Sequence, residues 1–158
     1  MLDPKELRRV MGHFATGITI ITTRSAEGTP YGLTANAFTS LSLDPPLCLV
    51  CVDRRAESFA HFYDSKVFTV NILSTEQEEL SNRFAKSGGD KFTGVSTAPG
   101  HHGAPLIAGA LVHLECVITD TLEGGDHVIH VGRVEHCDTS IGDPLLYYQG
   151  RYRRLAPA

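Results

Sequence analysis

Residues 33–55, LTANAFTSLSLDPPLCLVCVDRR, constrain the fold more than any other part of the chain. The segment begins with small and hydroxyl-bearing side chains, turns at Asp-Pro-Pro (44–46), and returns as an apolar run from Leu47 to Val52. Such a turn before an apolar run is typical of consecutive β-strands. Small residues let another molecule approach the backbone, and hydroxyl and amide groups donate hydrogen bonds to it. The segment therefore predicts paired strands that suit a flat ligand carrying a phosphate.

Helix signals are few and local. Asp3 is a good N-cap, Pro4 suits the first helical turn and Glu6 completes a capping box, so we expect a helix there that Gly17 ends. Its apolar positions 7, 10, 11 and 14 form one stripe. A second capping box at residues 75–78 predicts another helix. The expected helices are 4–16, 56–63 and 75–85, and the expected strands are 17–23, 31–38, 47–53, 67–73, 112–122, 127–137 and 147–155.

These elements show no regular β-α-β alternation. They therefore favour a mostly β fold, a small antiparallel barrel with peripheral helices, over a doubly wound parallel sheet. Residues 112–122 and 127–137 flank Gly124-Gly125 and predict a long hairpin. Residues 87–103 are polar and rich in glycine, and we expect a loop of the kind that forms lids or mobile segments.

Size and charge narrow the class of protein. The 158 residues predict a single domain, residues 1–158, large enough to bury a core without disulfides or metal. The formal charge of −4 argues against a nucleic-acid partner, and the one basic cluster, at 151–154, is too short to follow a phosphate backbone. No apolar run approaches the length of a membrane span, and the charged N-terminus has no signal-peptide core. We expect a soluble, cytoplasmic protein.

The cysteines and histidines give little support to a metal site. Cys48 and Cys51 form a C-x-x-C sequence, but residues three apart on a strand point to opposite faces and their sulfurs do not meet. They are expected to be small buried hydrophobic residues. The pair His101-His102, like His127 with His130, lacks the further ligands of a closed metal site. We expect no metal.

Nucleotide-binding motifs of the usual kinds are missing from the sequence. No G-x-G-x-x-G follows a strand, and there is no P-loop. A nicotinamide dinucleotide, if one binds, has to bind without a Rossmann unit.

Several segments together resemble the flavin reductase family of the FMN-binding split barrel, the small reductase components of two-component flavin monooxygenases. The resemblance covers nearly the whole chain, and it implies an antiparallel, Greek-key-like barrel. The segments that carry it are HFATGITIITT (13–23), the stretch 33–55, FTVNIL (68–73), LSNRFA (80–85), KFTG (91–94), GDH (125–127) and PLLYYQGRYRRL (144–155).

The resemblance implies a flavin site on the strand pair. Thr34, Ala35, Asn36 and Ala37 would follow the ring edge and ribityl chain, with Ser40 nearer the phosphate; alternatively, these residues merely face solvent. The residues that would hold the ring and the start of its tail are Cys51, Val52, Asp53 and Arg54.

The same resemblance implies groups at the phosphate and adenine end. Ser58 would cap the short helix or reach the phosphate, and Arg83 and Lys91 would supply positive charge to it. Phe84, followed by Ala85 in the family's R-F-A element, would pack against the adenine or dimethylbenzene part. The alternatives are that both cations are solvated surface charges and that Phe84 is a core residue.

Two residues are implied to be catalytic. His127 would lie over the flavin and contact the carboxamide of the nicotinamide; an imidazole can also modulate charge near the reacting ring. Tyr148 would lie near the flavin or nicotinamide, although a barrel-closing role suits it nearly as well and Tyr147 and Tyr152 compete for its place.

The implied activity is hydride transfer from NADH or NADPH to FMN or FAD, with the reduced flavin passing to a partner oxygenase. The resemblance also implies a homodimer with the flavin grooves near the subunit interface. A flavin-binding module for storage or electron transfer is the alternative. An oxidase similar to pyridoxamine phosphate oxidases is a third reading, but it calls for more basic residues than this acidic chain has.

Overall fold

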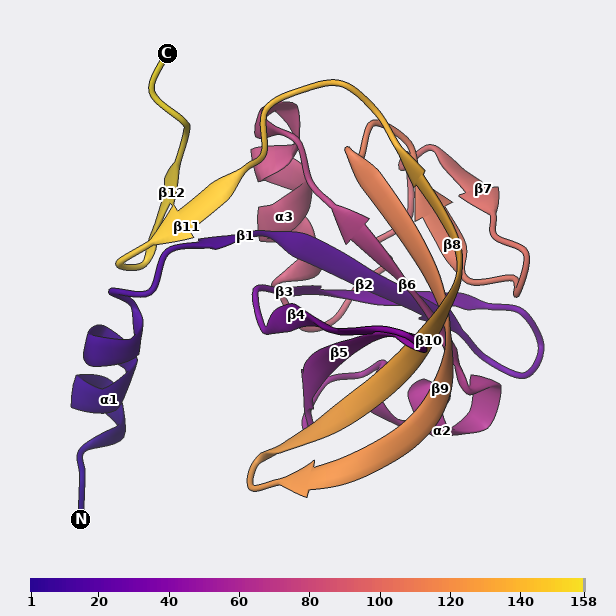
Figure 1. Cartoon of the computed structure of the whole chain (residues 1–158), viewed down its shortest axis with the longest axis horizontal. Helices are drawn as coiled ribbons and strands as arrows, with labels where there is room; N and C mark the ends of the chain where they lie inside the picture. The colour runs from indigo at the N-terminus through magenta and orange to yellow at the C-terminus, as the bar shows by residue number, and fades with distance from the viewer. Residues whose placement is uncertain (158) are drawn as a thin grey trace.

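The computed structural model describes residues 1–157, and its centre is a seven-stranded antiparallel sheet (Figure 1). The strand order is β3-β2-β6-β9-β10-β5-β4, so the two edge strands, β3 and β4, are consecutive in the chain. The sheet is rolled so that these edges approach each other (Figure 1). This confirms the predicted mostly β, antiparallel barrel. The strands are β2 (Thr19–Arg24), β3 (Pro30–Ala35), β4 (Phe38–Leu43), β5 (Pro46–Asp53), β6 (Val67–Ile72), β9 (Val112–Gly124) and β10 (His127–Thr139).

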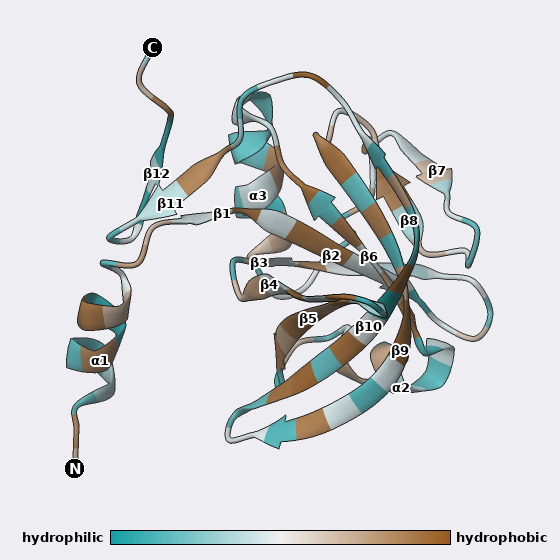
Figure 2. Cartoon of the chain, viewed as in Figure 1, coloured by the Kyte–Doolittle hydropathy of each residue, from teal (hydrophilic) through white to brown (hydrophobic). Residues whose placement is uncertain are grey.

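Strand β5 shows how the sequence sets the two faces of the barrel. Cys48, Val50 and Val52 are buried and alternate with half-buried residues that face outward, among them Cys51 and Asp53. Cys48 and Cys51 therefore point to opposite faces, as predicted. Apolar and polar residues are interspersed along β10 in Figure 2.

The core lies inside the barrel and is closely packed. Ile21, Val50, Phe62 and Phe68 belong to its main cluster. Gly132 of β10 is buried where a Cβ atom would come within 2.5 Å of the Phe68 ring, so only glycine fits there without a shift.

Two helices cover the barrel. Helix α2 (Phe59–Ser65) follows β5, and α3 (Glu78–Phe84) follows a 3-10 turn, η1 (Thr75–Gln77). The second capping box was predicted one residue too late. Its N-cap is Ser74, whose backbone N–H donates to the Gln77 side chain at 3.1 Å. None of the helices within residues 1–157 is long and apolar enough to cross a lipid bilayer.

An arm stands apart from the barrel (Figure 1). We define the arm as residues 1–17 and 146–157. It contains α1 (Pro4–Met11) and the small sheet β1-β11-β12, formed by β1 (Thr16–Gly17), β11 (Leu146–Tyr148) and β12 (Arg151–Arg153). Helix α1 begins where predicted but ends at Gly12, and it has no buried residue. The prediction that it continues to Gly17 was therefore wrong.

The predicted single strand 147–155 is a hairpin instead. Gln149 and Gly150 both adopt positive φ, at 50° and 75°, which is the geometry of a two-residue turn between strands. The glutamine gives no sequence signal for this conformation because non-glycine residues seldom adopt it.

Three further strands were missed. The predicted strand 31–38 ends at Ala35, and a new strand, β4, then runs from Phe38 to Leu43 beside β5. The predicted loop 87–103 contains β7 (Thr97–Pro99), which pairs with β8 (Pro105–Ile107). Serine and threonine in β4 and proline in β7 weaken the local strand signal. Both segments form strands because a neighbouring strand pairs with them.

Candidate functional site

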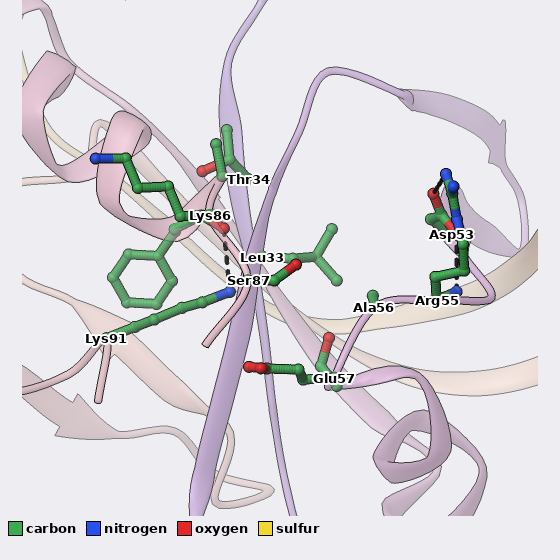
Figure 3. A pocket seen from close by; sticks show the side chains of 12 residues that line it. Leu33, Thr34, Asp53, Arg55, Ala56, Glu57, Lys86, Ser87 and Lys91 are labelled. Carbon is green, nitrogen blue, oxygen red and sulfur yellow. Dashed lines mark hydrogen bonds and ion pairs between the residues drawn. The ribbon is translucent and has the colours of Figure 1, made fainter. Parts of the chain in front are cut away.

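A polar pocket of about 420 Å³ opens where β3, β5 and α3 end (Figure 3). Thr34 of β3 forms part of its wall and donates to the Ser81 carbonyl at 2.6 Å, which fixes α3 against the strand. The lining residues are Leu33, Thr34, Asp53, Arg55, Ala56, Glu57, Ser58, Phe84, Ala85, Lys86, Ser87 and Lys91.

One end of the polar pocket carries groups suited to a phosphate. The Ser58 Oγ is buried and has no hydrogen-bond partner among the described residues. An unpaired buried hydroxyl costs free energy, which a ligand oxygen would recover. Lys91 Nζ donates to the Gly32 and Phe84 carbonyls at 3.4 Å each. These residues fit a phosphate-bearing ligand.

The charges at this end are balanced. Burial lowers the pKa of Lys91, and the nearby Glu57 carboxylate opposes that shift. Figure 3 shows the two side chains reaching into the pocket from different elements. A phosphate placed beside Lys91 would therefore also meet the negative charge of Glu57, which limits its affinity.

The other end of the polar pocket carries an ion pair between Asp53 and Arg55. Asp53 accepts from the Arg55 side chain at 2.8 and 3.1 Å and from its backbone N–H at 2.8 Å. The Arg55 guanidinium, as the main cause, lowers the pKa of Asp53 to about 2. Both residues are drawn at this end in Figure 3.

His127 begins β10 directly opposite Asp53 of β5. Its Nδ1 lies 2.7 Å from the Asp126 carboxylate, and this contact lowers the pKa of Asp126. A carboxylate on Nδ1 fixes the orientation of the imidazole, and Nε2 has no partner among the described residues. The side chain is 40% exposed, so Nε2 is available to a ligand.

An apolar pocket of about 370 Å³ lies further along the same strands, where the arm joins the barrel. Asn36, Ala37 and Cys51 line it from the barrel side, and burial raises the pKa of the Cys51 thiol. Met11 and Phe14 line it from the arm. Asn36 lies two residues after Thr34, and Cys51 lies two residues before Asp53. The apolar and polar pockets therefore lie on either side of the same strand ends.

Most residues predicted to hold a flavin line one of these two pockets. Ala35 is half-buried between them, and its carbonyl accepts from Thr19 Oγ1 at 2.6 Å. The residues in the polar pocket are Thr34, Asp53, Ser58, Phe84, Ala85 and Lys91, and those in the apolar pocket are Asn36, Ala37 and Cys51.

Other predicted residues lie elsewhere. The Val52 side chain is fully buried in the core, and Ser40 is exposed on β4. Arg54 donates to the Gly125 carbonyl at 3.1 Å and pairs with Glu123, and so fastens the hairpin tip.

Arg83, Tyr148 and His127 line neither of the two pockets, although His127 lies opposite Asp53 on the neighbouring strand. Arg83 donates to the Thr93 carbonyl at 3.0 Å, and Tyr148 lies on the arm against the His13 ring.

The sequence reasoning missed several pocket residues. Arg55, Ala56 and Glu57 connect β5 to α2, and Lys86 with Ser87 follows α3. For residues 55–57 a signal existed, because loops at strand ends carry binding groups and these three residues closely follow the apolar run.

Known proteins match the chain along nearly its full length. The family described as flavin reductase like domain matches residues 11–156. The reductase component of 4-nitrophenol 4-monooxygenase/4-nitrocatechol 2-monooxygenase from Rhodococcus opacus is 43% identical over 156 residues, covering 99% of this chain and 83% of that protein. The NADH-dependent FAD reductase from Streptomyces globisporus is 43% identical over 166 residues, covering 99% and 90%.

Solved structures of similar proteins also match the fold of this chain. The NADH:FAD oxidoreductase of Streptomyces globisporus superposes with a TM-score of 0.92 at 43% identity, covering 99% of this chain and 98% of that chain. Nitrilotriacetate monooxygenase component B from Mycobacterium thermoresistibile gives a TM-score of 0.92 at 40% identity, covering 97% and 87%. With the barrel, the pockets and these matches taken together, the chain belongs to the flavin reductase-like domain family.

Proposed function

We propose that the chain is an NAD(P)H:flavin oxidoreductase that reduces FMN or FAD. Membership of the flavin reductase-like family supports the activity. The observation that carries the proposal is the arrangement of the polar pocket, with an unpartnered Ser58 hydroxyl and Lys91 at one end and Asp53, opposite His127, at the other. Consumption of reduced nicotinamide that requires added flavin is the direct test.

The bound nicotinamide and flavin supply the hydride chemistry, and the protein positions them. Ser58 donates to the phosphate and Lys91 balances its charge. His127, oriented by Asp126, presents Nε2 to the nicotinamide carboxamide and acts as an aligner. Residues Thr34 to Ala37 offer backbone groups and small side chains to the ring edge. Orientation is therefore the main contribution of the chain.

A flavin-binding module without nicotinamide oxidation is the second candidate. The observation that favours it is that neither predicted catalytic residue, His127 or Tyr148, lines either pocket, although His127 lies opposite Asp53. Flavin binding without turnover would establish this candidate.

Exchange of Glu57 for glutamine is expected to tighten FMN binding about five-fold, because it removes a negative charge from the phosphate end. Riboflavin has no phosphate, so its affinity should stay unchanged. Equilibrium titration, followed by the quenching of flavin fluorescence, measures both affinities.

The matched control is Glu79→Gln, which makes the same change of charge on the exposed side of α3. It should leave both affinities unchanged. Equal tightening of FMN and riboflavin in Glu57→Gln would mean that Glu57 does not face the phosphate.

We also propose that two copies of the chain form a homodimer through the arm. The apolar residues of the arm are exposed, with Phe14 at 77%. Six of the chain's 14 Lys and Arg lie on the arm against two of its 18 Asp and Glu, so the arm is basic and the barrel acidic. A second copy supplies both a matching apolar surface and the opposite charge.

Light scattering is expected to give about twice the chain mass of 17.2 kDa, and Phe14→Asp should shift the protein toward the monomer. A monomer mass for the unmodified chain at micromolar concentration would contradict the dimer.

In the proposed function, the reduced flavin is passed on to a second enzyme. The neutral balance of Glu57 and Lys91 favours modest affinity, so reduced flavin leaves the pocket. A flavin-dependent oxygenase that receives it by diffusion is the proposed partner, in keeping with the relative from Rhodococcus opacus, which is a monooxygenase reductase component.

A further inference from the structure

A second cavity adjoins the phosphate end of the polar pocket. This side pocket has a volume of about 200 Å³ and lies between the turn before β3 and the loop after α3. Glu57, Ser58 and Lys91 line both cavities, so the two share one wall. The remaining lining residues are Thr29, Pro30, Tyr31, Gly32, Gly89, Asp90 and Phe92.

Two aromatic rings give the side pocket firm walls. Tyr31 stacks on the His61 ring with centroids 3.8 Å apart, and Phe92 meets Phe84 edge to face at 4.9 Å. Both rings are therefore held in place by neighbours outside the cavity. Aromatic walls of this kind suit a flat heterocycle, because every nucleobase has a π-face.

The loop that closes the side pocket is also ordered by its own contacts. The Asp90 carboxylate accepts from the backbone N–H groups of Phe92 and Thr93 at 3.0 and 3.2 Å. The Thr93 hydroxyl, which also donates to this carboxylate, is the main cause that lowers the pKa of Asp90, and together these bonds satisfy its charge within the turn. The polar groups that remain for a ligand are therefore at the shared wall, where Ser58 and Lys91 donate and the Glu57 carboxylate accepts.

We propose that the side pocket binds the adenylate half of FAD, so that the chain prefers FAD to FMN. The proposal rests on the proposed function, because it takes the polar pocket as the site of the flavin half. The diphosphate then lies at the shared wall beside Ser58 and Lys91. The adenine lies between the turn at Thr29–Tyr31 and Phe92, with Glu57 accepting from its amino group or from a ribose hydroxyl.

Thr29→Trp tests this placement. Thr29 is exposed and lines the side pocket but not the polar pocket, so a bulky ring there should block the adenylate and spare FMN. In the unmodified chain we expect FAD to bind at least about five-fold more tightly than FMN, the lower range for one stacked base. In Thr29→Trp this ratio should fall to about one, with the FMN affinity unchanged.

Ser96→Trp is the matched control, since Ser96 is also exposed but lines neither cavity. It should keep the preference for FAD. Adenosine monophosphate should displace FAD from the unmodified chain and leave riboflavin bound.

Equal affinities for FAD and FMN in the unmodified chain would overturn the side-pocket proposal, as would a preference that survives Thr29→Trp. In both cases FMN still binds and the reductase proposal stands. Failure of every flavin to bind would instead overturn the proposed function itself.

Discussion

Replacement of His127 with alanine is expected to lower kcat/KM for the reduced nicotinamide about 10- to 100-fold and to leave FMN affinity nearly unchanged. The Nε2 atom of His127 has no partner among the described residues, while Asp126 fixes the ring at 2.7 Å. Loss of a hydrogen bond to a polar group in the site costs about 1.5–3 kcal/mol, which corresponds to that change in rate. In its proposed role His127 aligns the nicotinamide, so KM should rise as well as kcat fall.

Steady-state kinetics and flavin titration on the same preparation separate the two effects. His136→Ala is the matched control, since it removes an exposed histidine from the same strand that contacts His101 and does not lie opposite Asp53. His127→Gln, which keeps a donor, should recover part of the loss. Unchanged kinetics in His127→Ala would remove this residue from the site, and a matching loss of FMN affinity would give it a different role.

The second large effect is a loss of stability in acid that depends on His130. This histidine is fully buried, stacks on Phe62 and lies with Nδ1 3.0 Å from Thr121 Oγ1. Burial lowers its pKa to about 4. In the unfolded chain the value returns to about 6.5. The unfolded state therefore binds more protons between these values, and stability falls as the pH drops from about 6.5 to about 4.

The contribution of His130 to this loss is at most about 3 kcal/mol, from the size of the shift. Urea unfolding is measured at a series of pH values on the unmodified chain and on His130→Leu. The comparison isolates the contribution of His130, because all other groups titrate in both proteins. We expect the free energies of unfolding to converge or cross as the pH falls, since leucine binds no proton. Two curves that run parallel from pH 7 to pH 4 would contradict this assignment.

Local patterns were enough to predict much of the barrel. The apolar run 47–52 predicted the strand that forms β5, and the glycines at 124–125 predicted the hairpin of β9 and β10, which turns at Gly125-Asp126. Each signal comes from residues that are close together in the sequence, and both predictions were confirmed. Strand β4 was missed because its serines and threonine satisfy a strand only through pairing with β5. The turn at Gln149 was missed because a positive φ at glutamine depends on its neighbours in the arm.

The lining of the polar pocket was predicted best where the sequence determines which side of a helix or strand faces inward. Phe84 is buried beside the polar pocket, and consecutive helical residues point about 100° apart, so Arg83 faces away and donates to the Thr93 carbonyl. Glu57 was missed because a phosphate site directs attention to positive charge, whereas the loop after β5 brings a carboxylate to Lys91.

The most direct test of the account is the oxidation of NADH, and then NADPH, by the purified chain with FMN, FAD, riboflavin or no flavin added. We predict turnover that requires added flavin and saturates with it, because in the proposed function the flavin is a substrate that enters and leaves the polar pocket. No oxidation of either nicotinamide with any flavin would contradict the account and leave a flavin-binding module in its place.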